Sequence, residues 1–226
     1  CVNQINRNGT VEQKAKYLPR LISGEHVGAL AMSEPNAGSD VVSMKLRAEK
    51  RGDRYVLNGS KTWITNGPDA NTYVIYAKTD LDKGPHGITA FIVERDWKGF
   101  SRGNKFDKLG MRGSNTCELF FDNVRVPQAN VIGSEGMGFM MQMLQFQEER
   151  IFCAASALGG MSKCVELTID YARQRMIYGK PLLDQQVVHF RLAELMTEIE
   201  ALRGLVHSVC EQHIAGDNVT MTASMA

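Results

Sequence analysis

The stretches NTYVIYAKT (residues 71–79) and GITAFIVE (residues 87–94) decide the fold class of this chain. Both are rich in β-branched and aromatic residues and are flanked by Gly, Asn, Asp or Pro, which is typical of strands bounded by turns. Three neighbouring stretches have the same character, namely VGALAMS (27–33), KLRAEKRGDRYVLNG (45–59) and SNTCELFFDNV (114–124). Short strands at such intervals predict an antiparallel β-barrel or sandwich over residues 26–133.

A short helix is predicted before this β region. Thr10 and Gln13 have the spacing of a capping box, apolar residues follow at helical intervals, and Gly24 supplies a stop. Within the β region, Gly52 and Asp53 predict a hairpin turn, and Cys117, Leu119 and Phe121 are expected on one face of a strand.

The sequence after residue 133 has a helical period. Two runs, 136–160 and 163–175, precede a third run in which apolar residues alternate at spacings of four and three. This stripe comprises Val188, Leu192, Leu195, Ile199, Leu202, Val206 and Val209. Such a stripe, on a helix from about Asp184 to His213, predicts an antiparallel bundle completed by helices beyond Ala226 or by another subunit. The expected fold class is therefore α+β.

Composition excludes several functional classes. The 226 residues suffice for one or two domains at about 150 residues each, and 43% apolar with 23% charged residues is ordinary for a globular chain. A net charge of +1 gives no general field for nucleic acid or a membrane surface, and no stretch is long enough to span a bilayer. The five cysteines never fall in C-x-x-C spacing, so we expect no metal and a reducing compartment.

The ends of the sequence also carry an expectation. The chain begins at Cys1 rather than Met and ends at Ala226 inside a helical pattern, which predicts a fragment. No signal-peptide pattern is present, so we expect a bacterial cytoplasmic protein, with the mitochondrial matrix as the alternative.

Two segments of the β region are candidates for binding a ligand. LAMSEPNAGSD (30–40) leaves a strand for a turn of small residues, whose N–H and hydroxyl groups suit a polar ring edge or a phosphate. In NGSKTWITNG (58–67), Trp63 and Thr65 share one side of a strand between two Asn-Gly turns, which suits stacking on a flat heterocycle. The alternatives are a purely structural turn and a Trp that fills the barrel core.

Two segments of the helical region are further candidates. In RQRMIYGKPLLDQQ (173–186), Arg175 lies where one helix ends and the next begins, where it can bind a phosphate or cap the preceding helix. In QEERIF (147–152), one of Glu148 and Glu149 can enter an apolar pocket and act as a base. Periodicity does not decide between them, and the alternative is a solvated face with Arg150 as ion partner.

Together these four motifs resemble the acyl-CoA dehydrogenase family, flavoproteins that desaturate acyl-CoA thioesters between Cα and Cβ. AMSEPNAGSD and WITNG are highly specific to that family. The resemblance implies the end of an N-terminal helical domain (1–25), a middle β-barrel domain (26–133) and an incomplete C-terminal four-helix bundle (134–226). It also implies FAD as cofactor, electron-transferring flavoprotein as electron acceptor and a homotetramer.

The resemblance assigns roles residue by residue. The residues that it places against FAD are Leu30, Ala31, Met32, Ser33, Gly38, Ser39, Trp63, Ile64 and Thr65, with Arg175 and Gln186 reaching the FAD of a neighbouring subunit. Those that it places against the acyl-CoA are Ser39, Met140, Gln147, Glu148, Glu149 and Arg150. Glu149, directly before Arg150, matches the catalytic base of the minority of the family that carries it on this helix.

The implied substrate differs along the chain. Residues 1–133 resemble the isovaleryl-CoA type, which acts in leucine degradation, whereas residues from 136 onward are closer to the citronellyl-CoA and long-chain types. The expected reaction is therefore dehydrogenation of an acyl-CoA, with a branched substrate such as isovaleryl-CoA as the first prediction. The alternatives are an oxidase or monooxygenase relative that passes electrons to O2, and a catalytically silent oligomerising module.

Overall fold

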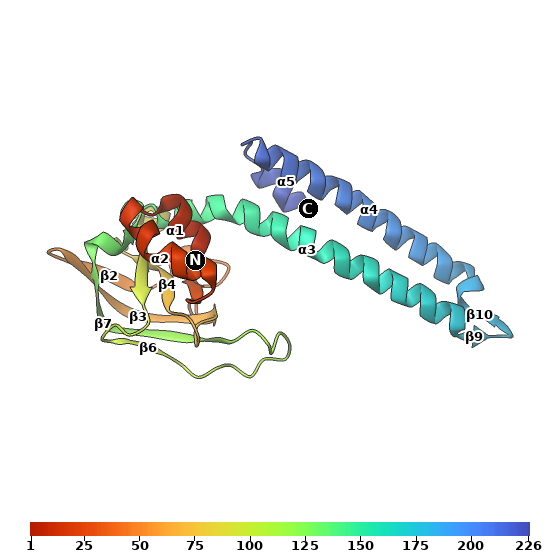
Figure 1. Ribbon diagram of the computed structural model, residues 1–226, viewed down its shortest axis with the longest axis horizontal. Helices are drawn as coiled ribbons and strands as arrows, with labels where there is room; N and C mark the ends of the chain where they lie inside the picture. Colours follow the sequence, from red (N-terminus) through yellow and green to blue (C-terminus); the bar gives the residue numbers. More distant parts are fainter. The chain divides into compact units, whose positions relative to one another are not determined.

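The computed structural model describes residues 1–226, which form two compact units, Cys1–Met143 and Leu144–Ala226 (Figure 1). The first unit opens with two helices, α1 (Val2–Asn8) and α2 (Val11–Ser23). The predicted capping box at Thr10 and Gln13 is confirmed, and Gly24 ends α2 in the left-handed conformation at φ 81°. Helix α1 was not expected from the sequence.

Eight strands of the first unit form one sheet in the order β6-β7-β3-β2-β4-β5-β8, with β1 added alongside β4. Their bounds are β1 Gly28–Ala31, β2 Arg47–Arg51, β3 Arg54–Thr65, β4 Thr72–Lys78, β5 Ile88–Glu94, β6 Phe100–Arg102, β7 Thr116–Pro127 and β8 Val131–Ile132. Short 3-10 turns lie at Val41–Ser43, Gly84–Gly87 and Gln128–Asn130. The predicted Gly52-Asp53 turn is confirmed, since Arg51 pairs with Arg54 across it.

The sheet differs in two ways from an antiparallel barrel. Strands β1 and β4 pair in parallel along their length, and β2 meets β4 in parallel at Arg47 and Lys78. The end strands β6 and β8 are not paired with each other, so the sheet is not closed. A period of two specifies which face of a strand is buried but not which strand lies beside it, which is why the sequence did not reveal these pairings.

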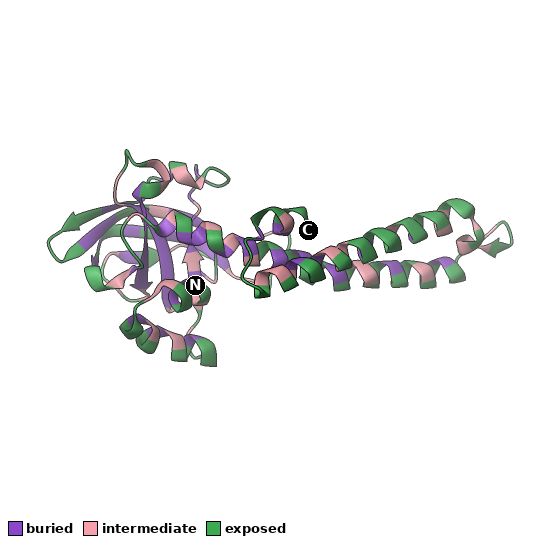
Figure 2. Ribbon diagram, turned by 90° about the horizontal axis from the view of Figure 1, so that it is seen from above, coloured by how far each residue is buried: buried purple, intermediate pink, exposed green.

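Apolar side chains pack on both faces of this sheet. One cluster includes Leu57, Phe91 and Leu119, and Cys117, Leu119 and Phe121 are buried together as predicted. The other cluster includes Ile5, Tyr17 and Leu21 of the two helices, which cover the opposite face of β4 and β5. Figure 2 shows this buried interior running through the strands. The ligand-binding candidates in this unit therefore lie at the margin of a rigid core.

The second unit consists of helices and a small hairpin. Helix α3 (Gly138–Gln174) begins in the first unit and continues here, followed by β9 (Met176–Ile177), β10 (Lys180–Pro181), a 3-10 turn (Leu182–Asp184), α4 (Gln186–Ile214) and α5 (Thr220–Met225). The two predicted runs 136–160 and 163–175 form one continuous helix. Glycines at 159 and 160 cost about 1 kcal/mol each within a helix, an amount that packing can override.

The heptad stripe of α4 is buried against α3. Leu192, Ile199 and Val206 pack with Ala154, Leu158 and Val165 of α3, which runs beside α4 in Figures 1 and 2. Large apolar side chains remain exposed on the other faces of these helices, among them Phe152, Leu167 and Phe190. Residues 144–226 thus hold two long helices and one short helix, so a four-helix bundle is not completed within them. No helix of the chain is both long enough and apolar enough to cross a bilayer.

Candidate functional site

Trp63 projects outward from a bulge in β3. Lys61 pairs with Leu119 and Ile64 with Cys117, so three steps along β3 match two along β7. Trp63 takes up the extra residue at φ 59° and is 64% exposed, whereas Ile64 is buried. The indole therefore does not fill the core, and its only aromatic neighbour is Phe106, whose ring meets it edge-on at 4.8 Å.

Trp63 and Thr65 lie on the same exposed side of β3, as predicted. The second Asn-Gly pair is the expected turn, since the Gly67 N–H donates to the Ile64 carbonyl. The first pair is not a turn, because Asn58 and Gly59 lie inside β3. A Cβ at Gly59 would approach the Leu46 side chain to 3.0 Å, so this glycine permits the close approach of the stretch that precedes β2.

The turn segment 30–40 is tied directly to this bulge. The Thr62 N–H donates to the Ser33 carbonyl at 3.0 Å, and the Lys61 ammonium donates to the Met32 carbonyl at 2.8 Å. Two successive carbonyls of the turn segment therefore point toward β3. A trans peptide has its C=O and N–H on opposite sides, so the Ser33 N–H points away from Lys61, and no group of the chain accepts a hydrogen bond from it.

The other predicted residues of this segment divide by burial. Ala31 and Met32 are buried and Leu30 is half-buried, so these residues form its base. Gly38 and Ser39 are exposed at its tip. The segment therefore offers a free backbone donor, an exposed hydroxyl and, through its tie to Thr62, a neighbouring exposed indole. These are the groups that suit the polar edge and the flat face of a heterocycle.

The acidic pair of the second unit is divided between two environments. Glu148 lies 3.0 Å from Nε2 of His213, and its side chain is 24% exposed. Glu149 is exposed and accepts a hydrogen bond from Nε2 of Gln145 at 2.6 Å. The geometry thus engages Glu148 with His213 and leaves Glu149 the more accessible carboxylate.

The neighbours of this pair are also placed. Gln147 is buried and its Oε1 accepts a hydrogen bond from the Val219 N–H at 3.1 Å. The Arg150 guanidinium lies over the Phe146 ring at 5.8 Å, a cation–π contact. Met140, which belongs to the first unit, is 40% exposed.

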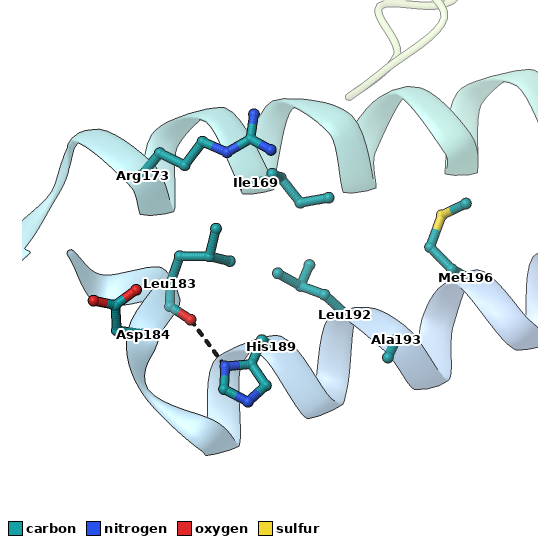
Figure 3. Close-up of a pocket in the computed structure, with 8 residues that line it drawn as sticks. All are labelled: Ile169, Arg173, Leu183, Asp184, His189, Leu192, Ala193 and Met196. Carbon is teal, nitrogen blue, oxygen red and sulfur yellow. Dashed lines mark hydrogen bonds between the residues drawn. The ribbon is translucent and has the colours of Figure 1, made fainter.

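Arg175 and Gln186 lie on either side of the β9–β10 hairpin and are both exposed. The backbone of Arg175 is fixed by bonds with Tyr171 and Leu182, but its guanidinium makes no hydrogen bond or ion pair within the chain. It therefore does not cap α3. Next to this corner is a hollow of about 640 Å³ between α3 and α4, into which Ile169 and Leu192 point (Figure 3). Its wall includes Leu183, whose carbonyl oxygen is hydrogen-bonded to Nδ1 of His189 at 3.0 Å.

Comparison with protein families assigns both units. The profile "Acyl-CoA dehydrogenase, middle domain" matches residues 29–124, and "Acyl-CoA dehydrogenase, C-terminal domain" matches residues 136–226. The chain belongs to the acyl-CoA dehydrogenase family. The predicted family and α+β class are thereby confirmed.

Comparison with individual proteins gives the same family assignment. The chain is 54% identical to a mitochondrial 2-methylacyl-CoA dehydrogenase of Solanum tuberosum, over 93% of this chain and 51% of the relative. It is also 54% identical to a mitochondrial isovaleryl-CoA dehydrogenase of Oryza sativa subsp. japonica, over 92% and 51%. The crystal structure of acyl-CoA dehydrogenase from Geobacillus kaustophilus superimposes with a TM-score of 0.94 at 43% identity, over 99% of this chain and 59% of that one. The chain thus spans about half the length of the curated relatives it matches.

The acyl-CoA dehydrogenase middle domain contains a buried ion pair that sequence reasoning missed. Lys61 Nζ lies 2.9 Å from Glu34 Oε1, and the two side chains are 0% and 8% exposed. Both residues lie within the two candidate ligand-binding segments, but charged residues in turns and strands are usually solvated. The sequence carries no signal for this pair, because the alternation that places Trp63 and Thr65 on one side of the strand places Lys61 on that side as well.

This ion pair predicts a rise in stability at alkaline pH. Burial lowers the pKa of Lys61 to about 8, and the charge of Glu34 opposes this only in part. The pKa of a lysine in the unfolded chain is about 10.4. Between about pH 8 and 10 the unfolded state therefore binds more protons than the folded state, so the free energy of unfolding rises by about 1 kcal/mol per pH unit. Burial also lowers the pKa of Lys78, which is present in both proteins, so we expect urea unfolding to show a larger rise in the chain than in Lys61→Met/Glu34→Gln.

The difference between the two proteins isolates the contribution of the pair. Burial raises the pKa of Cys117 and of Tyr73, which opposes stability at high pH, but both groups are present in both proteins. A stability difference that stays constant from pH 7.5 to 9.5 would contradict the shift of Lys61.

Proposed function

We propose that the protein carrying this chain is an FAD-dependent acyl-CoA dehydrogenase that oxidises a branched acyl-CoA to its 2-enoyl thioester. The observation that carries the proposal is the outward Trp63 at a bulge hydrogen-bonded to the turn segment with the free Ser33 N–H. This arrangement occurs in a member of the acyl-CoA dehydrogenase family and presents what a flavin ring requires, a flat apolar surface and a polar donor.

The residues present in the first unit fit this cofactor. We assign to it Leu30, Ala31, Met32, Ser33, Gly38, Ser39, Trp63, Ile64 and Thr65. When bound, FAD supplies the acceptor for the hydride that leaves Cβ of the substrate. The chain itself supplies the indole surface of Trp63 and the hydroxyl of Thr65, both exposed on one side of β3. The buried Ile64 between them anchors that strand in the core.

Arg175 and Gln186 are assigned to the FAD of a neighbouring subunit in a homotetramer. Both side chains are exposed, and the Arg175 guanidinium has no partner within its own chain. Arginine binds phosphate oxygens in a bidentate manner, so a dinucleotide pyrophosphate is a suitable partner for it.

Glu149 is assigned as the base that removes the α-proton of the thioester. Its carboxylate is accessible, whereas Glu148 is engaged with His213. We also assign Ser39, Met140, Gln147, Glu148 and Arg150 to the binding of the acyl-CoA. Proton removal develops enolate-like charge on the thioester carbonyl, so hydrogen-bond donors at that oxygen are the main electrostatic requirement of the reaction.

The substrate that we propose is a short branched acyl-CoA, with isovaleryl-CoA first and leucine degradation as its setting. Two relatives with 54% identity are named for isovaleryl and for 2-methylacyl groups, which are both branched. Electron-transferring flavoprotein is the proposed acceptor of the electrons. The compartment stays a prediction, because the relatives include mitochondrial enzymes and a Bacillus subtilis enzyme.

The test is an anaerobic visible spectrum of the intact protein before and after addition of isovaleryl-CoA, 2-methylbutyryl-CoA, butyryl-CoA and citronellyl-CoA. We expect a yellow protein whose flavin absorbance is bleached by the branched short thioesters. A colourless protein that takes up no FAD would contradict the proposal. Bleaching by citronellyl-CoA alone would retain the reaction and overturn the substrate, and peroxide formation at the turnover rate in air would indicate an oxidase.

A further inference from the structure

Lys61 and Glu34 connect three separate segments of the first unit. Lys61 belongs to β3, Glu34 to the turn segment after β1, and the Glu34 carboxylate reaches the stretch before β2. There its Oε2 accepts from the Lys45 N–H at 2.6 Å and its Oε1 from the Leu46 N–H at 2.9 Å. The pair therefore lies at a junction of the chain rather than along one strand.

Every proton of the Lys61 ammonium has an acceptor. Besides Glu34, these are the Met32 carbonyl at 2.8 Å and the Met44 sulfur at 3.6 Å. A lysine ammonium has three donors, so this buried group is fully satisfied. Such a network is rigid, because moving any one segment leaves a buried charge or donor without its partner.

A buried ion pair is a poor device for stability alone. The desolvation of two charges offsets much of their attraction, and apolar residues of similar size often serve the fold as well or better. The best-attested use of such pairs is to fix one arrangement among several. The arrangement that this pair fixes is the direction of the Met32 carbonyl and, through the planar peptide, that of the Ser33 N–H.

We propose that Lys61 and Glu34 are a positioning pair. They hold residues 32–34 of the turn segment in register with the bulge at Trp63 and so fix the orientation of the groups that contact the flavin ring. The inference rests on the proposed function. Neither residue touches the cofactor in this scheme. Lys61 acts through Met32, and the adjacent Thr62 N–H makes the second tie, to the Ser33 carbonyl.

Loss of the pair is expected to release both ties. Without the ammonium, the Met32 carbonyl is buried with no donor, and rotation of that peptide is the way it regains one. The rotation turns the Ser33 N–H and strains the bond between Thr62 and Ser33. The turn segment and the bulge then no longer hold a single relative position.

The test is the double variant Lys61→Met/Glu34→Gln. Methionine keeps the length of the lysine stem, and glutamine keeps one acceptor oxygen for the N–H group of Lys45 or of Leu46, so no charge is left buried alone. Lys78→Met is the matched control, because Lys78 is a buried lysine of the same sheet whose ammonium bonds the Gly84 carbonyl, outside the turn segment.

The first measurement is a titration of the intact protein with FAD. The dissociation constant of FAD is expected to rise at least tenfold in the double variant and less than twofold in Lys78→Met. The visible spectrum at saturating FAD should also change in the double variant, since the ring lies in a different hydrogen-bonding environment. Unchanged affinity and spectrum would overturn the positioning role.

The second measurement needs no cofactor. Hydrogen exchange of the Thr62 amide, which bonds Ser33, should be at least tenfold faster in the double variant, whereas that of the Ile75 amide in β4 should be unchanged. Equal protection of the Thr62 amide in the two proteins would overturn the positioning role, whether or not the protein binds FAD. Absence of FAD binding, by contrast, would contradict only the proposed function. If the double variant does not fold, Lys61→Arg keeps the charge but displaces the donor, and it should weaken FAD binding at least threefold; an unchanged affinity there would overturn the proposal.

Discussion

Replacing Glu149 with Gln is expected to leave FAD bound and to slow bleaching of the flavin by acyl-CoA by about a thousandfold. Gln has the shape of Glu and retains a hydrogen-bonding partner for Gln145, but it cannot accept the α-proton. A positioned general base contributes roughly 10²–10⁴ in rate, so this is the largest effect of a single substitution that we expect. Stopped-flow absorbance under anaerobic conditions, with FAD content determined separately, measures it.

Glu148→Gln is the matched control for this prediction. Glu148 lies in contact with His213, and a glutamine at 148 can still form a hydrogen bond with that ring. Glu148 is assigned to the binding of acyl-CoA and not to proton transfer, so Glu148→Gln should weaken binding of the thioester, while bleaching at saturating acyl-CoA should stay within about threefold of the unaltered protein. The reverse result, a slow Glu148→Gln and a fast Glu149→Gln, would transfer the role of base to Glu148.

Trp63→Gly is expected to weaken FAD binding by between about tenfold and a hundredfold while leaving the fold intact. Stacking of a flat heterocycle on an aromatic side chain contributes about 1–3 kcal/mol, and ten- to a hundredfold corresponds to about 1.4–2.7 kcal/mol. Because Trp63 has φ 59°, glycine at this position removes left-handed strain, which offsets the contact with Phe106 that is lost. The free energy of unfolding should change by no more than about 1 kcal/mol.

Met111→Gly separates the two effects of that substitution. Met111 also has a positive φ, at 50°, and is exposed, so glycine relieves strain there without removing the indole. Isothermal titration with FAD and urea unfolding of both variants complete the comparison. If Trp63→Gly binds FAD as tightly as Met111→Gly, the indole is not part of the flavin site.

Local features of the fold could be predicted from the sequence because their causes are local. The capping box at Thr10, the turn at Gly52 and the inward face of Cys117 and Leu119 each depend on residues a few positions apart. The parallel pairing of β1 with β4 could not be predicted, since it joins residues more than forty positions apart in the sequence and leaves no trace in a period-two pattern. The same limit applies to α3, where packing overrides two glycines.

The candidate site shows the same division. Alternation predicted that Trp63 and Thr65 share one side of β3. It did not predict whether that side faces the core or the solvent, and in the structure Trp63 faces the solvent. The bulge that turns Trp63 outward is defined only by the register with β7. The burial of Lys61 was not predicted, because lysine side chains are almost never fully buried unless they are paired. The pairing depends on the position of Glu34, which only the structure shows.

The ion pair also constrains how this domain can change over evolutionary time. Removing either Lys61 or Glu34 alone leaves a buried charge with no counterion, at a cost of about 3–5 kcal/mol that is a large part of the stability of a domain. Replacement of both by apolar residues is far less costly, but every single-substitution route to it passes through one of the two damaged intermediates. We therefore expect Lys61 and Glu34 to be kept or replaced together, either in a stabilised background or by two simultaneous substitutions.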